Sequence, residues 1–251
     1  MAKPIALVTG LGRPAGIAAA IALKLARDGW DLAINHWAPA DQEIFGRSAN
    51  DGLDAVVATL EEAGASVLRV PADLERVDAA DLVLATTVAG LGAPSALVLS
   101  HAWDLDSGIL DTTVVQFDKH FAINTRASWQ LIAAFAKHLP EGTDGSIVAL
   151  TSDHTVGNLP YGASKGALDR IVIAAAKELA HLGITSNAVN PGPIDTGWMT
   201  DEVRATLTAL QPTGRLGTPA DTADLVAFLL SPEGHWITGQ LIKSDGGISI
   251  P

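Results

Sequence analysis

The stretch Ile5-Ala6-Leu7-Val8-Thr9-Gly10-Leu11-Gly12-Arg13-Pro14-Ala15-Gly16-Ile17 decides the fold. Its first four residues are apolar, and such a short run is typical of a buried strand. A glycine-containing loop follows and leads into an amphipathic run from Gly16 to Gly29. A strand that passes through glycines directly into a helix is typical of the first turn of a doubly wound α/β sheet.

Strand-like and helix-like segments alternate along the rest of the chain. This alternation needs a mostly parallel sheet with helices on both faces, because each crossover returns over one face. We therefore predict a doubly wound α/β fold of three α/β/α layers in a single domain, 1–251. The other predicted strands are Leu32–Ile34, Val67–Val70, Ala96–Leu99, Ser146–Leu150, Thr185–Val189 and Gln240–Lys243. The other predicted helices are Asp51–Gly64, Asp78–Gly90, Phe117–Leu139, Tyr161–Leu182 and Thr222–Leu230, and His36–Asn50 is predicted to be an inserted loop.

Composition restricts the class of protein. With 48% hydrophobic residues among 251, the chain can fill one large core. Sixteen Lys and Arg against 28 Asp and Glu give a formal charge of -12, which disfavours nucleic acid and anionic membranes as partners. The absence of Cys excludes disulfides, thiolate metal sites and a cysteine nucleophile, and we expect no metal site. The N-terminus lacks a signal-peptide pattern and no apolar run reaches roughly 18 residues, so we expect a soluble, cytoplasmic protein.

One predicted helix is too apolar for the outside of a sheet. Ile171-Val172-Ile173-Ala174-Ala175-Ala176 is apolar around its whole circumference. Either a neighbouring loop or a helix of a second subunit must cover it, and we favour the second subunit. The expected assembly is a homodimer or homotetramer.

The glycine loop predicts a dinucleotide site. Glycines let backbone approach a pyrophosphate, and the N-terminus of the following helix offers unpaired N–H groups, although many strand-to-helix turns need glycines for geometry alone. An acid usually contacts the ribose of NAD at the end of the second strand, but this chain has Asn35-His36-Trp37 there. NADP(H) is therefore favoured over NAD(H), with Arg13, His36 or Arg47 as the source of positive charge. Alternatively, Arg13 is only a solvated loop residue and the ribose is contacted differently.

Tyr161 and Lys165 are four residues apart and therefore share one face of a helix. Tyr161 is the only tyrosine in the chain. A nearby ammonium favours phenolate, so a tyrosine beside a lysine can accept or donate a proton. Outside a site, the same spacing is an ordinary surface pair.

Two more polar residues accompany this pair. Ser152 ends a predicted strand just before the Tyr161 helix, at the edge where open α/β sheets have their sites, so its hydroxyl can hold a substrate oxygen. Its alternative role is a turn hydroxyl. Asn124 lies inside a predicted helix, where its amide can bend the helix around a water or relay protons through Lys165, unless it is a plain polar helix residue.

Together these residues resemble the short-chain dehydrogenase/reductase family, nearly from end to end. The matching segments are the Thr9-Gly10 loop, Asp73, Asn124, Ser152, Tyr161-x-x-x-Lys165, Asn190-Pro191-Gly192-Pro193, Ile237-Thr238-Gly239-Gln240 and Asp245-Gly246-Gly247. The nearest-looking members are similar to 3-oxoacyl-carrier-protein reductase and are commonly tetramers. The resemblance implies a Rossmann-type sheet, a nicotinamide cofactor, Tyr161 as acid/base, Lys165 on the nicotinamide ribose and Ser152 orienting the substrate.

The chain departs from this family in three places. Its glycine loop is about two residues longer than usual, Ser100-His101-Ala102-Trp103 replaces the common Asn-Asn-Ala-Gly, and the Ser152–Tyr161 loop is about four residues shorter. We expect His101 to be a hydrogen-bonding spacer rather than a catalytic group. Asp73 is expected to hold adenine or to cap a helix. The expected cofactor-binding residues are Gly10, Gly12, Arg13, Gly16, Ile17, Asn35, His36, Asp73, Leu74, Ser100, His101, Ala102, Tyr161, Lys165, Pro191, Gly192, Ile194 and Thr196.

These features give three functional hypotheses. The first is an NADP(H)-dependent reductase that converts a ketone to an alcohol, with Asn124, Ser152, Tyr161 and Lys165 as its catalytic set. The second is an NAD-dependent alcohol dehydrogenase, and Asn35 is the position that separates the two. The third is a non-catalytic nucleotide-binding sensor or structural subunit, because a fold alone does not prove turnover. The expected substrate wall, compatible with many ketones, is Trp103, His154, Leu159, Trp198 and Met199.

Overall fold

Seven parallel strands form one sheet in the part of the chain that the computed structural model describes, residues 2–45, 50–197 and 199–250. They are β1 (Ile5–Val8), β2 (Asp31–His36), β3 (Val67–Pro71), β4 (Ala96–Leu99), β5 (Gly145–Leu150), β6 (Ile184–Asn190) and β7 (Leu241–Lys243). The strand order is β3-β2-β1-β4-β5-β6-β7. The chain therefore reverses its direction of winding between β1 and β4, and this is the point where open α/β sheets form their ligand crevice.

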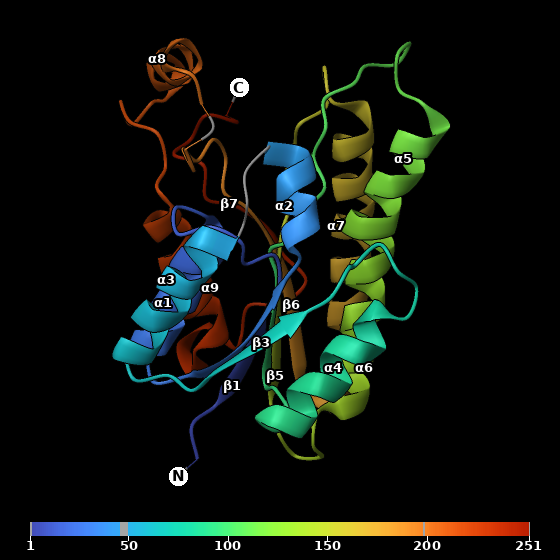
Figure 1. Ribbon diagram of the computed structural model, residues 1–251, viewed down its shortest axis with the longest axis vertical. Helices are drawn as coiled ribbons and strands as arrows, with labels where there is room; N and C mark the ends of the chain where they lie inside the picture. The colour runs from blue at the N-terminus through green and yellow to red at the C-terminus, as the bar shows by residue number, and fades with distance from the viewer. Residues whose placement is uncertain (1, 46–49, 198, 251) are drawn as a thin grey trace.

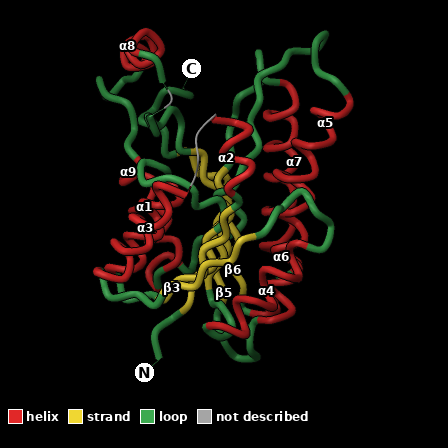
Figure 2. The backbone as a smooth tube through the Cα atoms, viewed as in Figure 1, coloured by secondary structure: helices red, strands yellow, loops and turns green. Residues whose placement is uncertain are grey.

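Helices cover both faces of the sheet, as Figures 1 and 2 show. One layer holds α1 (Ile17–Arg27), α3 (Asn50–Glu62) and α9 (Pro219–Leu230). The other holds α4 (Ala79–Gly90), α5 (Val114–His120), a π-helix (Phe121–Ala127), α6 (Ser128–His138) and α7 (Leu159–Glu178). The predicted Rossmann-type, doubly wound, three-layer single domain is confirmed.

The sheet buries alternate residues of each strand against the two helical layers. In β1, Ala6 and Val8 pack toward α1 and α9, whereas Leu7 packs toward α4 and α6. All three side chains are fully buried. This period of two follows from the pleat of a strand, and it explains why central strands buried on both faces are continuously apolar in sequence.

One prediction from the sequence was wrong, and one helix was missed. The predicted loop His36–Asn50 contains α2 (Ala38–Phe45), which has a weakly amphipathic sequence and therefore gave little periodic signal. No helix was predicted at α8 (Asp201–Leu210), which has no buried residue and so lacks an apolar stripe. Both helices lie toward the carboxyl ends of the strands, at the upper end of Figure 1.

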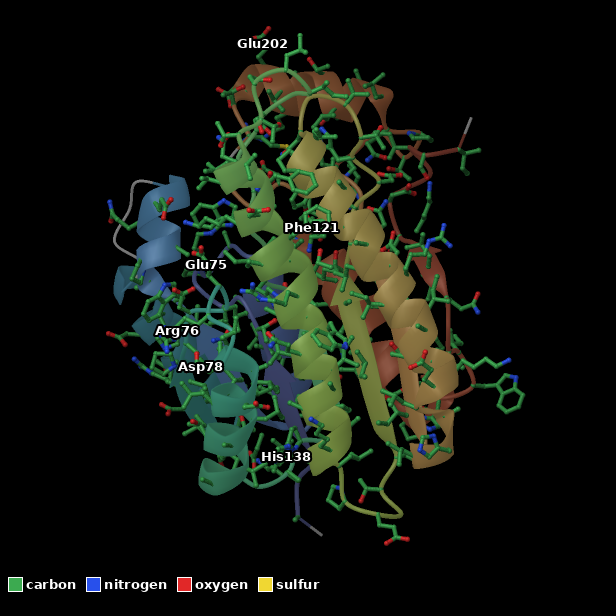
Figure 3. All side chains as sticks on the ribbon, turned by 90° about the vertical axis from the view of Figure 1, so that its right-hand side faces the viewer. Glu75, Arg76, Asp78, Phe121, His138 and Glu202 are labelled. Atoms are coloured by element: carbon green, nitrogen blue, oxygen red, sulfur yellow. The ribbon has the colours of Figure 1, made fainter. Side chains whose placement is uncertain are left out.

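The predicted helix Phe117–Leu139 is three segments. The first segment, α5, starts at Val114, before the predicted Phe117, because Thr113 caps it. The Thr113 hydroxyl accepts from Gln116 N, and Gln116 Oε1 accepts from Thr113 N. The middle segment is the π-helix, which runs on into α6 beside α7 (Figure 3). Phe121, at the junction, stacks on Phe117 with ring centroids 4.6 Å apart.

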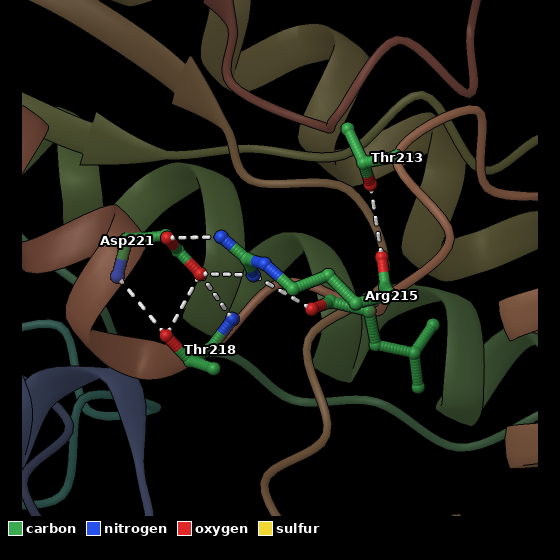
Figure 4. Close-up of polar contacts among 5 residues, drawn as sticks. Thr213, Arg215, Thr218 and Asp221 are labelled. Atoms are coloured by element: carbon green, nitrogen blue, oxygen red, sulfur yellow. Dashed lines mark hydrogen bonds and ion pairs between the residues drawn. The ribbon is translucent and has the colours of Figure 1, made fainter.

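The start of α9 is fixed by a dense polar cluster (Figure 4). Thr218 Oγ1 accepts from Asp221 N, and the Asp221 carboxylate accepts from Thr218 N, so the two residues form a capping box. Arg215 donates through both terminal nitrogens to the same carboxylate, at 2.8 Å each. These contacts hold the pKa of Asp221 well below its usual range.

Within the described residues, no helix has both the length and the apolar character needed to cross a membrane.

Candidate active site

A cavity of about 550 Å³ opens at the carboxyl ends of the central strands. That volume lies in the range of small-molecule and cofactor sites. The predicted residues that line it are Gly10, Gly12, Arg13, Gly16, Ile17, Asn35, Asp73, Leu74, Ser100, His101, Ala102, Trp103, Tyr161, Lys165, Pro191 and Thr196. The lining also contains residues that were not predicted: Leu11, Ala18, Trp37, Ala40, Ala72, Asp104, Ile123, Leu150 and Thr151.

The glycine loop leaves the N-terminus of α1 open toward this cavity. Gly16 is the N-cap, and no side chain caps the helix. The first N–H groups of a helix have no intrahelical partner, and Ile17 and Ala18 of this first turn line the cavity. Gly10 has φ 76°, and a Cβ there would lie 2.5 Å from His101 Cα. The loop therefore fits a phosphate group in the way the sequence predicts.

At the end of β2, Asn35 and Trp37 line the cavity, whereas His36 between them does not. The buried Asn35 amide donates to Val70 O at 3.1 Å and to Ala72 O at 3.2 Å, so it ties β2 to β3 while lining the cavity. The side chain of His36 points to the other face of the strand from Asn35 and does not line the cavity. Burial, and to a lesser extent the charge of Arg69, lowers the pKa of His36. Trp37 lines the cavity and is 38% exposed. Trp37 was not predicted as a site residue, although its position directly after β2 is a sequence signal for the carboxyl edge of the sheet.

Of the three predicted sources of positive charge, Arg13 is the one that lines the cavity. Its Nη1 donates to Thr196 O at 3.0 Å, which joins the glycine loop to the loop after β6. Arg47 lies outside the described residues.

Asp73 lines the cavity and accepts from Glu75 N at 2.9 Å. Its alternative role as the cap of the following helix was wrong, because the N-cap of α4 is Asp78.

Tyr161 and Lys165 project from α7 into the same cavity. The Lys165 ammonium lies 5.8 Å from the centre of the Tyr161 ring and donates to Leu150 O at 2.9 Å. Burial lowers the pKa of Lys165 to about 8, against the opposing charges of Asp104 and Asp169. Burial and the charge of Asp104 raise the pKa of Tyr161, and contact with the Ser152 hydroxyl acts in the opposite direction.

Asn124 lies fully buried in the π-helix and holds the segment after β4 in place. Its Oδ1 accepts from Trp103 N at 2.7 Å, and its Nδ2 donates to Trp103 O and to Ser164 Oγ, both at 2.9 Å. Ser164 in turn donates to Tyr161 O at 2.7 Å. The amide therefore contacts the helix that carries the tyrosine, and π-turns of this kind are frequent at functional sites.

Other predicted residues lie at the rim or outside the cavity lining. Ser152 is half-buried and accepts from His154 N at 3.2 Å, and His154 is exposed. Leu159 and Met199 are half-buried and do not line the cavity, and Trp198 lies outside the described residues. Ile194 packs on Gly217, and Gly192, with φ 64°, packs on Asp245. The described residues contain no cluster of three or more His, Asp or Glu side chains that could hold a metal ion.

Comparisons with known proteins agree with this architecture. Residues 10–249 match the family model described as Enoyl-(Acyl carrier protein) reductase. An uncharacterized oxidoreductase, YjdA of Bacillus subtilis, is 37% identical over 98% of this chain and 96% of its own length. An NADPH-dependent aldehyde reductase-like protein, chloroplastic, of Arabidopsis thaliana is 34% identical over 98% of this chain and 94% of its own.

A solved structure gives the same result. The angucycline C-6 ketoreductase LanV with bound NADP superposes with a TM-score of 0.87 at 30% identity, over 99% of this chain and 96% of that one. The doubly wound fold is thus shared with that structure over nearly the whole length of both chains. The chain belongs to the short-chain dehydrogenase/reductase family of oxidoreductases.

Proposed function

We propose that this protein is an NADP(H)-dependent reductase that converts a ketone or aldehyde carbonyl to an alcohol. The observation that carries the proposal is a single cavity with an uncapped helix N-terminus at one wall and Tyr161 and Lys165 at another. The first feature suits a dinucleotide phosphate, and the second suits proton transfer to a carbonyl oxygen. The bound NADP of the related ketoreductase supports the same assignment.

The protonation states favour reduction. Burial and Asp104 raise the pKa of Tyr161, so its phenol keeps its proton at neutral pH and can give it to the developing alkoxide. Ser152 orients the carbonyl oxygen toward this phenol. Lys165 stays mostly protonated at pH 7 and holds positive charge beside the phenol, while Asn124 fixes the backbone opposite α7. A bound NADPH would supply the hydride.

The preference for NADP(H) over NAD(H) rests on two residues. Asn35 replaces the usual acid at the end of β2, so no carboxylate at that position repels a 2'-phosphate. Arg13 lines the cavity and can add a charge-assisted hydrogen bond to the phosphate.

A cytoplasmic location and a homodimer or homotetramer remain predictions from the sequence.

The test is titration of tryptophan fluorescence with NADPH and, separately, with NADH. Trp37 and Trp103 line the cavity, so bound nicotinamide should quench their emission. We expect tighter binding of NADPH, and we expect Arg13→Ala to weaken it about ten- to a hundredfold with little effect on NADH. The Trp37→Phe variant identifies the part of the signal that comes from Trp37.

A ketone panel then tests catalysis. Tyr161→Phe should bind NADPH like the wild type but lose reduction by about a hundredfold or more, because it removes only the acid. Preference for NADH in the titration would replace the proposal with the NAD-dependent alcohol dehydrogenase. Failure to bind either cofactor would favour the non-catalytic protein.

A further inference from the structure

A carboxylate that the reaction scheme does not use stands beside the catalytic tyrosine. Asp104 follows Trp103 after β4 and lines the same cavity as Tyr161 and Lys165. Its side chain is exposed, and its negative charge acts on the phenol of Tyr161 and on the ammonium of Lys165. A ligand whose carbonyl reaches Tyr161 must therefore pass close to this charge.

Asn158, at the start of α7, holds Asp104 in position through a side-chain hydrogen bond. Asn158 is the N-cap of α7, where an asparagine side chain normally accepts from the first turn, but here it makes no such bond. Instead its Nδ2 donates to Asp104 Oδ1 at 2.5 Å and to Asp106 Oδ1 at 2.8 Å. Asn158 is 2% exposed, and its Oδ1 has no hydrogen-bond partner among the described residues.

A backbone bond strengthens this attachment. Leu159 N donates to Ser107 O at 2.9 Å, so the acidic segment 104–107 is joined to the start of the helix that carries Tyr161. The positive end of the α7 dipole stabilises carboxylates at this end of the helix. Asp104 and Tyr161 are therefore held in a fixed relation by the N-terminal turn of one helix.

Among the described residues, Asp104 forms no direct ion pair, in contrast to two other acids of this end of the sheet. Asp153 pairs with Lys243 at 3.2 Å, and Asp195 pairs with Arg204 at 2.6 Å. Within the described part of the chain, neither Asp104 nor Asp106 forms an ion pair. The Asp104 carboxylate at the cavity wall can therefore accept a hydrogen bond from a donor on a bound ligand.

We propose that Asp104 is a specificity residue that selects carbonyl substrates with a hydrogen-bond donor, an ammonium or a hydroxyl, near the carbonyl and disfavours substrates with a carboxylate there. The inference rests on the proposed function because it names the substrate class of that site. A charged acceptor forms stronger hydrogen bonds than a neutral one. At a partly solvated site each such contact or repulsion changes affinity by about twofold to fivefold.

The experiment compares four acetophenones that differ only in the meta substituent: methyl, hydroxymethyl, aminomethyl and carboxylate. With NADPH and the wild type, we expect kcat/KM to be highest for the aminomethyl and hydroxymethyl ketones and lowest for the carboxylate. Asp104→Asn should reduce the ratio of aminomethyl to carboxylate about tenfold, whereas Asp104→Glu should keep most of it. Asp106→Asn is the matched control, since it removes the same charge from the other carboxylate bound by Asn158, which does not line the cavity.

A second readout does not depend on turnover. Because Tyr161 is the only tyrosine, biosynthetic 3-fluorotyrosine gives one ¹⁹F resonance at the site. Titration of that resonance with each ketone, with and without NADP⁺, yields dissociation constants that should follow the same order. The same aminomethyl-to-carboxylate ratio in the wild type and Asp104→Asn, or no response of the resonance to any ketone, overturns the inference. The expected order of binding without reduction of any ketone supports the role of Asp104 but contradicts the proposed reductase.

Discussion

The Nδ1 atom of His101 lies 2.7 Å from the hydroxyl oxygen of Thr9, which joins the end of β1 to the segment after β4. The other ring nitrogen, Nε2, lies 3.1 Å from Ile123 O. A carbonyl only accepts, so Nε2 carries the proton and Nδ1 accepts from Thr9. A neutral imidazole thereby connects three elements at the switch point of the sheet. This agrees with the expected role of His101 as a hydrogen-bonding spacer.

Acid stability should depend on His101. Burial, followed by the charge of Lys165, lowers its pKa from 6.5 to about 3. Between these values the unfolded chain binds a proton that the folded chain does not, so stability falls as pH drops, by about 1.4 kcal/mol per pH unit for this group. His101→Asn retains hydrogen bonding without titrating. Urea unfolding between pH 7 and 5 should show a shallower slope for this variant.

His181, which is exposed, provides the control for that measurement. His181→Asn removes one exposed imidazole and so controls for the loss of a histidine as such. Equal slopes for the wild type and His101→Asn would show that the imidazole is not held neutral in the folded protein.

Reduction should weaken above about pH 8. Burial lowers the pKa of Lys165 to about 8, so at higher pH the folded protein loses the positive charge that stabilises the site. We expect log kcat/KM for ketone reduction to fall with a slope approaching one per pH unit above that value. Lys165→Arg, which stays charged, should be slower but lack this decline. A decline at the same pH in the variant would assign it to another group.

Lys119 should stabilise the buried Trp103 through its aromatic face. The ammonium lies 3.6 Å from the centre of a Trp103 ring, and this tryptophan is 2% exposed. Lys119→Met should lower the free energy of unfolding by about 0.5–2 kcal/mol. Glu43→Gln removes only the closer of the two ion pairs of Lys119, at 3.0 Å, and should cost less than about 1 kcal/mol. Equal losses in urea unfolding would assign the effect to the ion pair instead.

The threonine caps Thr218 and Thr200 should differ in their effect on global stability. Thr218 caps α9, which packs against α1, whereas Thr200 caps α8, which has no buried residue. Thr218→Ala should therefore cost about 1 kcal/mol, and Thr200→Ala should cost clearly less because α8 can fray without exposing core. Thermal unfolding of both variants tests this, and a larger effect at Thr200 would contradict it.

Much of the site could be predicted because its signals are local. Tyr161 and Lys165 share a helix face through their spacing alone. Asn35 is the next-to-last residue of β2 and Ser152 follows β5 by two residues, so both lie at the carboxyl edge. The missed elements α2 and α8 have little apolar periodicity. Asp104 was missed for a different reason, because nothing in its sequence neighbourhood indicates that it faces Tyr161.

The sequence by itself determined the alternation of strands and helices, the glycine turn and the tyrosine–lysine pair, since each depends on the intrinsic period or conformational freedom of a short segment. Tertiary structure decided which distant groups meet. The contact of Arg13 with Thr196 O spans 183 residues, and the hydrogen bond between Asn158 and Asp104 spans 54. Such contacts exist because the strand order brings the carboxyl ends of β1, β4, β5 and β6 to one edge, and burial there shifts the pKa values on which the chemistry depends.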